Sequence, residues 1–255
     1  MKITSKITSL IFEIGQNIID FVFPPACPYC DKTIDSHNLF CQECFKKISF
    51  IERSICHWCG KPLFLEDISQ TEKMLCPDCM NKRPVYDLAR AVFIYDNFSK
   101  ISILKFKYAD KMEYSYQFVN LMQRAGRDLF DKTDLIIPVP MHWKRRLRRY
   151  YNQADVLGKL LAKRVHIPYS SKILFRSRYT SPQENKSFNE RKHNVKDAFC
   201  VRKNTLIKGK NILLIDDVFT TGATVNNCAK ALKKAGAKAV YVLTIAKALK
   251  KGDTQ

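Results

Sequence analysis

Three features that would mark common classes of protein are missing from this chain. It has no run of about 18 or more apolar residues, so no transmembrane helix is expected. No small-residue cleavage site follows its first apolar stretch, residues 10–23, which argues against a signal peptide. The Gly-Lys-Ser/Thr ending that a Walker A loop requires is also absent. We therefore expect a cytoplasmic protein that is not a P-loop NTPase.

Acidic residues are scarce relative to basic ones. The 255 residues include 44 Lys and Arg against 24 Asp and Glu, which gives a formal net charge of +20. An excess of this sign favours polyanionic partners: nucleic acid, a pyrophosphate group or an acidic membrane surface. The length suits one domain of catalytic size and a smaller module, and the 46% hydrophobic content is sufficient for a core.

Residues 1–23 form the first expected segment, an amphipathic helix. Apolar residues at positions 7, 10, 11, 14, 18 and 21 follow helical spacing, and polar residues interrupt the run between them. Packing of this helix against the rest of the protein is the favoured interpretation. Contact with a membrane surface remains the alternative.

Eight of the ten cysteines are arranged as four C-x-x-C pairs in residues 24–84. This spacing is typical of zinc knuckles, two of which complete a tetrahedral site of four thiolates. Disulfides are the alternative, but a chain without a secretion signal is expected in a reducing compartment. Such closed sites would be structural, and they would stabilise a module with few buried aliphatic residues. The expected ligands are Cys27, Cys30, Cys41, Cys44, Cys56, Cys59, Cys76 and Cys79.

The grouping of the four cysteine pairs is less certain than the metal. A sequential arrangement joins the first two pairs in one site and the last two in another, and it is the one we favour. A crossed arrangement would interleave them. The remaining cysteines, Cys200 and Cys228, are expected to be small buried residues.

The stretch from Asn211 to Thr224 is the most informative part of the chain. Ile212 to Ile215 are four branched aliphatic residues, the pattern of a parallel strand buried on both faces. A helix is predicted over 223–235, where Gly236 ends it, and a second strand over 239–246. The three elements form a β-α-β unit with a right-handed crossover. Any ligand chemistry should lie at the carboxyl end of the first strand.

Two kinds of side chain follow that strand. Thr220, Thr221, Gly222 and Thr224 form the turn into the helix, where backbone N–H groups and the helix dipole favour a phosphate. Asp216 and Asp217 come just before and would repel a phosphate unless they face hydroxyl groups or a metal. A sugar phosphate satisfies both halves of the stretch. A receiver-type acidic pair and a strand-turn-helix without ligand are the competing interpretations.

This stretch resembles the phosphoribosyl-pyrophosphate (PRPP) binding motif of type I phosphoribosyltransferases. Upstream, strands are predicted over 89–95 and 134–140, with Pro138 and Pro140 at the end of the second. Helices are predicted over 101–107, with Ser99 as a cap, over 113–130 and over 152–165. The chain thus has the alternating pattern of an α/β fold.

A basic cluster follows the proline-rich strand end. Its side chains would hold a diphosphate or follow a nucleic-acid backbone with aromatic residues as stacking platforms, and a solvated basic turn is the plain alternative. The cluster comprises Lys144, Arg145, Arg146, Arg148 and Arg149, together with Lys105 and Lys107 upstream. Residues 176–194 form a long polar loop, expected to close over a reactive sugar diphosphate. Its named candidates are Arg176, Gln183, Arg191 and Asn194.

Taken together, these motifs resemble the ComF (ComFC) family across nearly the whole chain. The shared features are the four cysteine pairs, residues 138–140 with the basic residues that follow them, residues 151–153, Arg191 with Asn194, residues 198–199 and residues 216–224. The resemblance implies a double zinc ribbon, residues 24–84, followed by a type I phosphoribosyltransferase-like domain, residues 85–255, in which helices flank a parallel sheet. It also implies a role in bacterial DNA uptake, with single-stranded DNA and other uptake proteins, such as a helicase-like protein, as partners.

The resemblance also implies roles for individual residues. Asp216 and Asp217 would take the ribose hydroxyls, and Thr220, Thr221, Gly222, Ala223 and Thr224 the 5′-phosphate. Val139, Pro140, Met141 and His142 would form the pyrophosphate loop. Two departures stand out: Tyr150 replaces a glycine of the family pattern, and Phe219 is larger than the residue usual in the wider group. Neither removes a charged group from the site.

Two functions remain open at this point. The favoured one is a PRPP-binding protein of the DNA-uptake machinery, in which the basic surface holds single-stranded DNA. The alternative is an active phosphoribosyltransferase of base or nucleotide salvage that uses PRPP and Mg²⁺. In that enzyme Asp216 or Asp217 would stabilise the positive charge that develops on the ribose.

Overall fold

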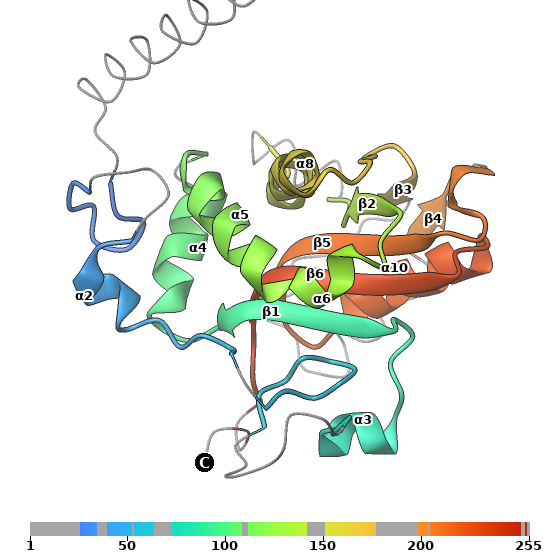
Figure 1. Cartoon of the computed structure of the whole chain (residues 1–255), viewed down its shortest axis with the longest axis horizontal. Coiled ribbons are helices and arrows are strands. Elements are labelled where there is room, and N and C mark those ends of the chain that lie inside the picture. Colours follow the sequence, from blue (N-terminus) through green and yellow to red (C-terminus); the bar gives the residue numbers. More distant parts are fainter. Residues whose placement is uncertain are drawn as a thin grey trace, which may run out of the picture.

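A computed structural model describes most of the chain (Figure 1). The residues described are 26–34, 40–52, 54–63, 73–108, 112–141, 151–176, 198–202, 205–250 and 253. The expected N-terminal helix, residues 1–23, lies outside this part. Within it, no helix is both long and apolar enough to cross a membrane.

A four-stranded parallel sheet forms the centre of the molecule (Figure 1). Its strands are β1 (Leu88–Ile94), β2 (Leu135–Pro138), β5 (Asn211–Phe219) and β6 (Ala239–Lys247), in the order β1-β6-β5-β2. Residues 212–215 of β5 have no exposed surface, because layers of side chains cover both faces of the sheet. The aliphatic run therefore predicted the central strand correctly.

β5 is longer than the aliphatic run indicates. Its pairing with β6 continues through Asp216 opposite Thr244 and Phe219 opposite Lys247. The two aspartates thus lie within the strand, and the prediction that they follow it is wrong. Backbone hydrogen bonds to β6 extend the strand, whatever the polarity of the side chains. Side chains along a regular strand point alternately to the two faces of the sheet. Ile215 and Val218 both pack on the same face, so this alternation is interrupted between them.

Four helices cover one face of the sheet: α4 (Ser99–Tyr108), α5 (Tyr114–Ala125), α6 (Arg127–Phe130) and α8 (Gln153–Val165). The single helix predicted over 113–130 is in fact two, α5 and α6, separated by Gly126. A Cβ atom at Gly126 would lie 2.6 Å from Leu243 Cδ2 of β6. The chain bends at Gly126, where the backbone lies too close to the sheet for a residue with a side chain to fit.

Helix ends follow local capping chemistry. The Asp96 carboxylate accepts a hydrogen bond from Ser99 N (2.7 Å), and Ser99 Oγ accepts one from Asp96 N (2.9 Å). Asp96 therefore caps α4, with Ser99 as the reciprocal member of a capping box, which corrects the prediction of Ser99 as the cap. Asn152, the first residue of the helix predicted over 152–165, is the N-cap of α8, because its side chain accepts from Ala154 N.

The other face carries α10 (Ala223–Lys234), the antiparallel pair β3 (Leu174–Arg176) and β4 (Phe199–Val201), and the 3₁₀ turn η1 (Thr205–Ile207). Gly236, with a φ of 100°, follows α10 as predicted. Its left-handed backbone turns the chain back towards β6.

The two cysteine modules attach to opposite faces. The first contains α2 (Gln42–Phe45) and packs beside α4, where the Tyr29 and Phe98 rings stack at 4.5 Å. The second contains α3 (Pro77–Asn81) and meets β1, where Ala89 N donates to Trp58 O (2.7 Å). Figure 1 shows α2 and α3 well apart.

The contact between the second module and β1 gives a test of the fold. Gly60 has a φ of +65°, and a Cβ atom there would lie 2.4 Å from Ala89 O. Gly209 has a similar φ of +72° but open space around it. Alanine at either position is therefore strained by the left-handed backbone. Alanine at Gly60 also clashes with Ala89 O. We expect Gly60→Ala to lose at least about 1 kcal/mol more than Gly209→Ala in urea unfolding. Equal losses would show that the module is not seated on β1 in this way.

Candidate zinc centres and phosphoribosyl site

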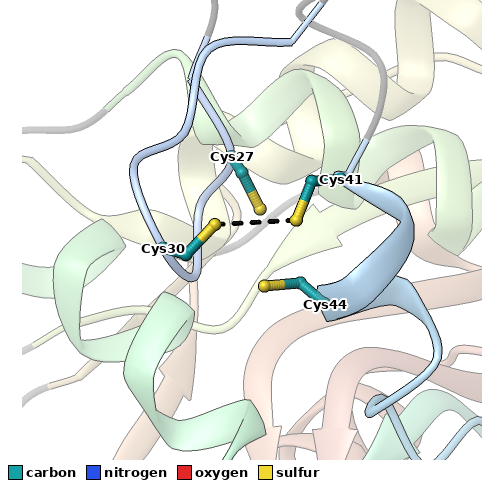
Figure 2. A group of neighbouring side chains, drawn as sticks. All are labelled: Cys27, Cys30, Cys41 and Cys44. Atoms are coloured by element: carbon teal, nitrogen blue, oxygen red, sulfur yellow. Dashed lines mark hydrogen bonds between the residues drawn. The ribbon is translucent and has the colours of Figure 1, made fainter.

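Each cysteine module brings four sulfur atoms together. The sulfurs of Cys27, Cys30, Cys41 and Cys44 lie within 4.8 Å of one another, as do those of Cys56, Cys59, Cys76 and Cys79. Figure 2 shows the first group, in which Cys27 and Cys30 from one loop and Cys41 and Cys44 from the start of α2 point to a common centre. This confirms the sequential grouping.

The spacing within each group fits a zinc ion. Tetrahedral zinc with Zn–S bonds of about 2.3 Å places its ligand sulfurs about 3.8 Å apart. The Cys30 and Cys41 sulfurs are 3.6 Å apart, and those of Cys59 and Cys76 are 3.7 Å apart. Four thiolates leave no coordination position for a substrate, so these zinc sites are structural. Cys228 is buried in the core as expected, whereas Cys200 is partly exposed.

The acidic pair of β5 is held by an ion pair that the sequence did not indicate. Lys107 Nζ of α4 lies 2.7 Å from Asp217 Oδ2, with both side chains about five-sixths buried. The backbone N–H of Asp217 donates to Asp216 Oδ1 (2.9 Å). Burial and the neighbouring charge of Asp217 raise the pKa of Asp216 to about 8. The ion pair with Lys107 and the raised pKa of Asp216 therefore both reduce the negative charge of the pair near neutral pH.

The turn after β5 has the geometry of an anion site. Gly222, with a φ of 74°, is the N-cap of α10, and Thr221 Oγ1 accepts from Ala223 N (3.3 Å). The side chains of Thr220 and Thr221 are exposed. Backbone N–H groups at the start of a 12-residue helix and the positive end of its dipole favour a phosphate here.

The end of β2 lies beside the middle of β5. Val139 N donates to Ile215 O (2.8 Å), so the segment 139–141 begins next to the residue that precedes the acidic pair. Val139 O in turn accepts from Asn152 Nδ2 (3.2 Å). Pro140 and Met141 are partly buried. His142 lies outside the described residues, as do Lys144, Arg145, Arg146, Arg148 and Arg149, and the loop candidates Gln183, Arg191 and Asn194.

Residues 151–153 join the parts of the site, a role that sequence reasoning missed. Tyr151 OH donates to Phe106 O (2.5 Å), and Gln153 Nε2 donates to Lys107 O (3.4 Å). Together with the Asn152 contact to Val139, these bonds tie the end of α4 and the end of β2 to the start of α8. They position the backbone of Lys107. The Tyr-Asn-Gln run marked the segment as part of the family pattern, but no local signal showed its contacts.

The structure separates the two lysines that we had grouped in one basic cluster. Lys105 Nζ binds the Asp31 carboxylate at 2.5 Å and the Tyr29 carbonyl at 3.3 Å, both in the first cysteine module. Lys107 faces the acidic pair of β5 instead. The guanidinium of Arg176, on β3, stacks on the Phe199 ring at 5.4 Å. These three cations therefore face three different surroundings.

Protein-family models match both halves of the chain. A double zinc ribbon domain matches residues 18–80, and a phosphoribosyl transferase domain matches residues 152–254. Together with the parallel sheet, these matches define a type I phosphoribosyltransferase-like fold joined to a double zinc ribbon.

Curated relatives narrow this class to a family. Competence protein F of Haemophilus influenzae is 31% identical over 230 residues, covering 87% of this chain and 96% of the relative. The DNA utilization protein YhgH of Escherichia coli K12 is 28% identical, covering 89% and 98%. Competence protein ComFC of Bacillus subtilis is 29% identical, covering 77% and 78%. The chain belongs to the ComF family.

The raised pKa of Asp216 predicts a specific dependence of stability on pH. The folded chain retains a proton on Asp216 up to about pH 8, whereas the ordinary value for an Asp is 3.8. The folded state therefore binds more protons between these values, and its stability falls as the pH rises towards 8. Between pH 6 and 8 we expect the free energy of unfolding to fall more steeply for the wild type than for Asp216→Asn. The difference in slope should be up to about 1 kcal/mol per pH unit.

Urea unfolding at several pH values measures this difference. Asp131→Asn, at an exposed aspartate, is the matched control and should keep the wild-type slope. Parallel curves for the wild type and Asp216→Asn would rule out a proton held at this carboxyl group.

Proposed function

We propose that this protein binds PRPP with Mg²⁺ and acts in DNA uptake, where its basic surface contacts single-stranded DNA. One observation carries the PRPP part: the acidic pair and the Gly222 turn lie in succession at the carboxyl end of a central parallel strand. That is the edge at which open α/β sheets bind ligands. Carboxylates suit ribose hydroxyls, and the helix N-terminus suits the 5′-phosphate.

The diphosphate has a place in the same proposal. The segment 139–142 begins against Ile215, just before the acidic pair of β5, and its backbone would receive the diphosphate. Mg²⁺ would be held by the diphosphate and the ribose hydroxyls. Of the basic residues, Lys107 lies at the acidic pair, where its ammonium is paired with Asp217.

The charge of the acidic pair favours binding over turnover. A phosphoribosyl transfer develops positive charge on the ribose, which negative carboxylates would stabilise. Lys107 neutralises Asp217, and Asp216 retains its proton up to about pH 8. Both effects reduce the negative potential of the pair. This supports a PRPP-binding role, with the salvage phosphoribosyltransferase as the second candidate.

The DNA part of the proposal rests on charge and on the relatives. The chain has a formal net charge of +20, and its relatives include competence and DNA utilization proteins. Single-stranded DNA would contact the Arg-rich segment 144–149, which lies outside the described residues. Thiolate zinc sites suit a reducing compartment, so a cytoplasmic location is part of the proposal.

Calorimetric titration with PRPP and Mg²⁺ tests the ligand. We expect binding by the wild type and at least about a tenfold loss of affinity in Asp216→Asn/Asp217→Asn, because the ribose hydroxyls lose the charge-assisted hydrogen bond to Asp217. Asp131→Asn should bind as the wild type does.

A wild-type protein that does not bind PRPP would overturn the proposal. A turnover assay separates the two functions. If a nucleobase and PRPP release pyrophosphate, and Asp217→Asn abolishes this release, the salvage enzyme replaces the binding protein.

The salt dependence of DNA binding tests the partner. Replacing Arg145, Arg146, Arg148 and Arg149 with Ala should weaken binding to single-stranded DNA. It should also reduce the slope of log affinity against log salt by about 3, since each lost phosphate contact contributes about 0.7.

A matched control replaces four exposed lysines on α8 and α10 with Ala: Lys159, Lys163, Lys230 and Lys234. It carries the same change in net charge. Equal slopes for the two quadruple variants would show that the protein responds to its overall charge alone, which contradicts an interface at residues 144–149.

A further inference from the structure

The residues that join the second cysteine module to the sheet lie against α10. This segment, residues 82–87, leads from α3 to β1 and is called the connector below (Figure 1). Near its start, the Arg83 guanidinium lies 5.0 Å from the centre of the Trp58 ring of the module. At its end, Asp87 N donates to Val240 O (2.8 Å), and the Asp87 carboxylate accepts from Val240 N (2.8 Å). The connector is therefore attached both to the module and to β6.

The connector also contacts both ends of α10. Val85 N donates to Asn226 Oδ1 in the first turn of the helix (2.8 Å). The Asp87 carboxylate pairs with Lys233 Nζ in the last turn (2.9 Å). These two contacts differ in their distance from the proposed phosphate turn. Asn226 N donates directly to Gly222 O (2.9 Å), whereas Lys233 is about two further turns of helix away.

An aromatic contact leads from the connector to the same turn. Tyr86 is only 3% exposed and meets the Phe219 ring edge-on, with the ring centres 5.9 Å apart. A Cβ atom at Gly222 would lie 2.8 Å from Phe219 Cζ, so the ring is packed against the N-cap of α10. Phe219 is the residue whose size departs from the wider phosphoribosyltransferase pattern. Its ring bridges the connector and the turn.

These contacts restrict a turn that has little to restrict it locally. Gly222 begins α10 with a left-handed backbone, and a glycine has more conformational freedom than any other residue. A phosphate at the helix N-terminus needs several backbone N–H groups directed at one point. Contacts from outside the turn fix those groups before the ligand arrives. A site ordered in advance binds its ligand at a lower entropic cost.

We propose that Asn226 and Phe219 are positioning residues through which the connector holds the N-terminus of α10 in place for a phosphate. The inference deepens the proposed function, because its effect on affinity rests on the proposed PRPP site. Since the connector continues directly from α3, the second cysteine module and the phosphate turn share one support.

The first test removes the acceptor of the Val85 hydrogen bond. Asn226→Leu has a similar size and no acceptor, whereas Asn226→Asp keeps an acceptor oxygen. We expect the Val85 amide hydrogen to exchange at least about tenfold faster in Asn226→Leu, because its hydrogen bond is lost. Exchange in residues 219–225 should also be faster in this variant. Asn226→Asp should retain the wild-type protection of both, as measured by hydrogen exchange with NMR detection.

The second test measures the affinity for PRPP and Mg²⁺ by calorimetry. The dissociation constant should rise at least about threefold in Asn226→Leu, which is within the range expected for one lost hydrogen bond. Tyr86→Leu, which removes the ring that meets Phe219, should raise both the exchange in residues 219–225 and the dissociation constant. Tyr86→Phe keeps the ring and should stay within about twofold of the wild type in both measurements.

Lys233→Met is the control at the far end of α10. It breaks the ion pair with Asp87 but leaves the first turn of the helix and its contacts unchanged. Both the exchange in residues 219–225 and the dissociation constant should therefore stay within about twofold of the wild type. Effects as large as those of Asn226→Leu would mean that any loosening of α10 disturbs the turn, which contradicts a positioning role of Asn226.

The remaining outcomes each decide one step. Unchanged exchange of the Val85 amide in Asn226→Leu would overturn the role of that hydrogen bond. Faster exchange at Val85 with wild-type exchange in residues 219–225 would overturn the link to the turn. Faster exchange in the turn with unchanged affinity would overturn the link to the phosphate. If the wild type does not bind PRPP, the proposed function fails, while hydrogen exchange still decides whether the connector holds the turn.

Discussion

The pairing of β5 with β6 is the constraint on which the rest of the site depends. It continues four residues beyond the aliphatic core of β5, through Phe219 opposite Lys247. This extension carries both aspartates to the edge of the sheet within a rigid strand and delivers the chain directly to the Gly222 turn. It also places Lys247 beside Phe219. A site built on a strand is held more firmly than one built on a loop, because the backbone ladder determines the positions of its side chains.

Charge is distributed very differently at the site and over the whole protein. The chain as a whole is strongly basic, yet the acidic pair is balanced by Lys107 and by the proton on Asp216. The two aspartates therefore repel an anion less than their number alone would suggest.

The two zinc ribbons differ in what they touch. The first packs beside α4 and reaches Lys105 through Asp31, on the same face as α5 and α8. The second is hydrogen bonded to β1 and lies against the face that carries α10 and Phe219. The two ribbons therefore contact different parts of the sheet domain.

Local pattern determined a large part of this protein: the cysteine pairs, the aliphatic run at 212–215, the caps of α8 and the Thr-Gly turn all follow from short-range chemistry. The family resemblance and the fold class rest on these features. The sequence alone did not show that β5 extends through the aspartates, that Gly126 divides α5 from α6, or that Lys107 binds Asp217. Each of these depends on a partner far away in the chain, such as β6 for the extended strand. Because a lysine on an amphipathic segment has the same local signature whether it meets solvent, Asp31 or Asp217, only the tertiary structure decided where Lys105 and Lys107 point.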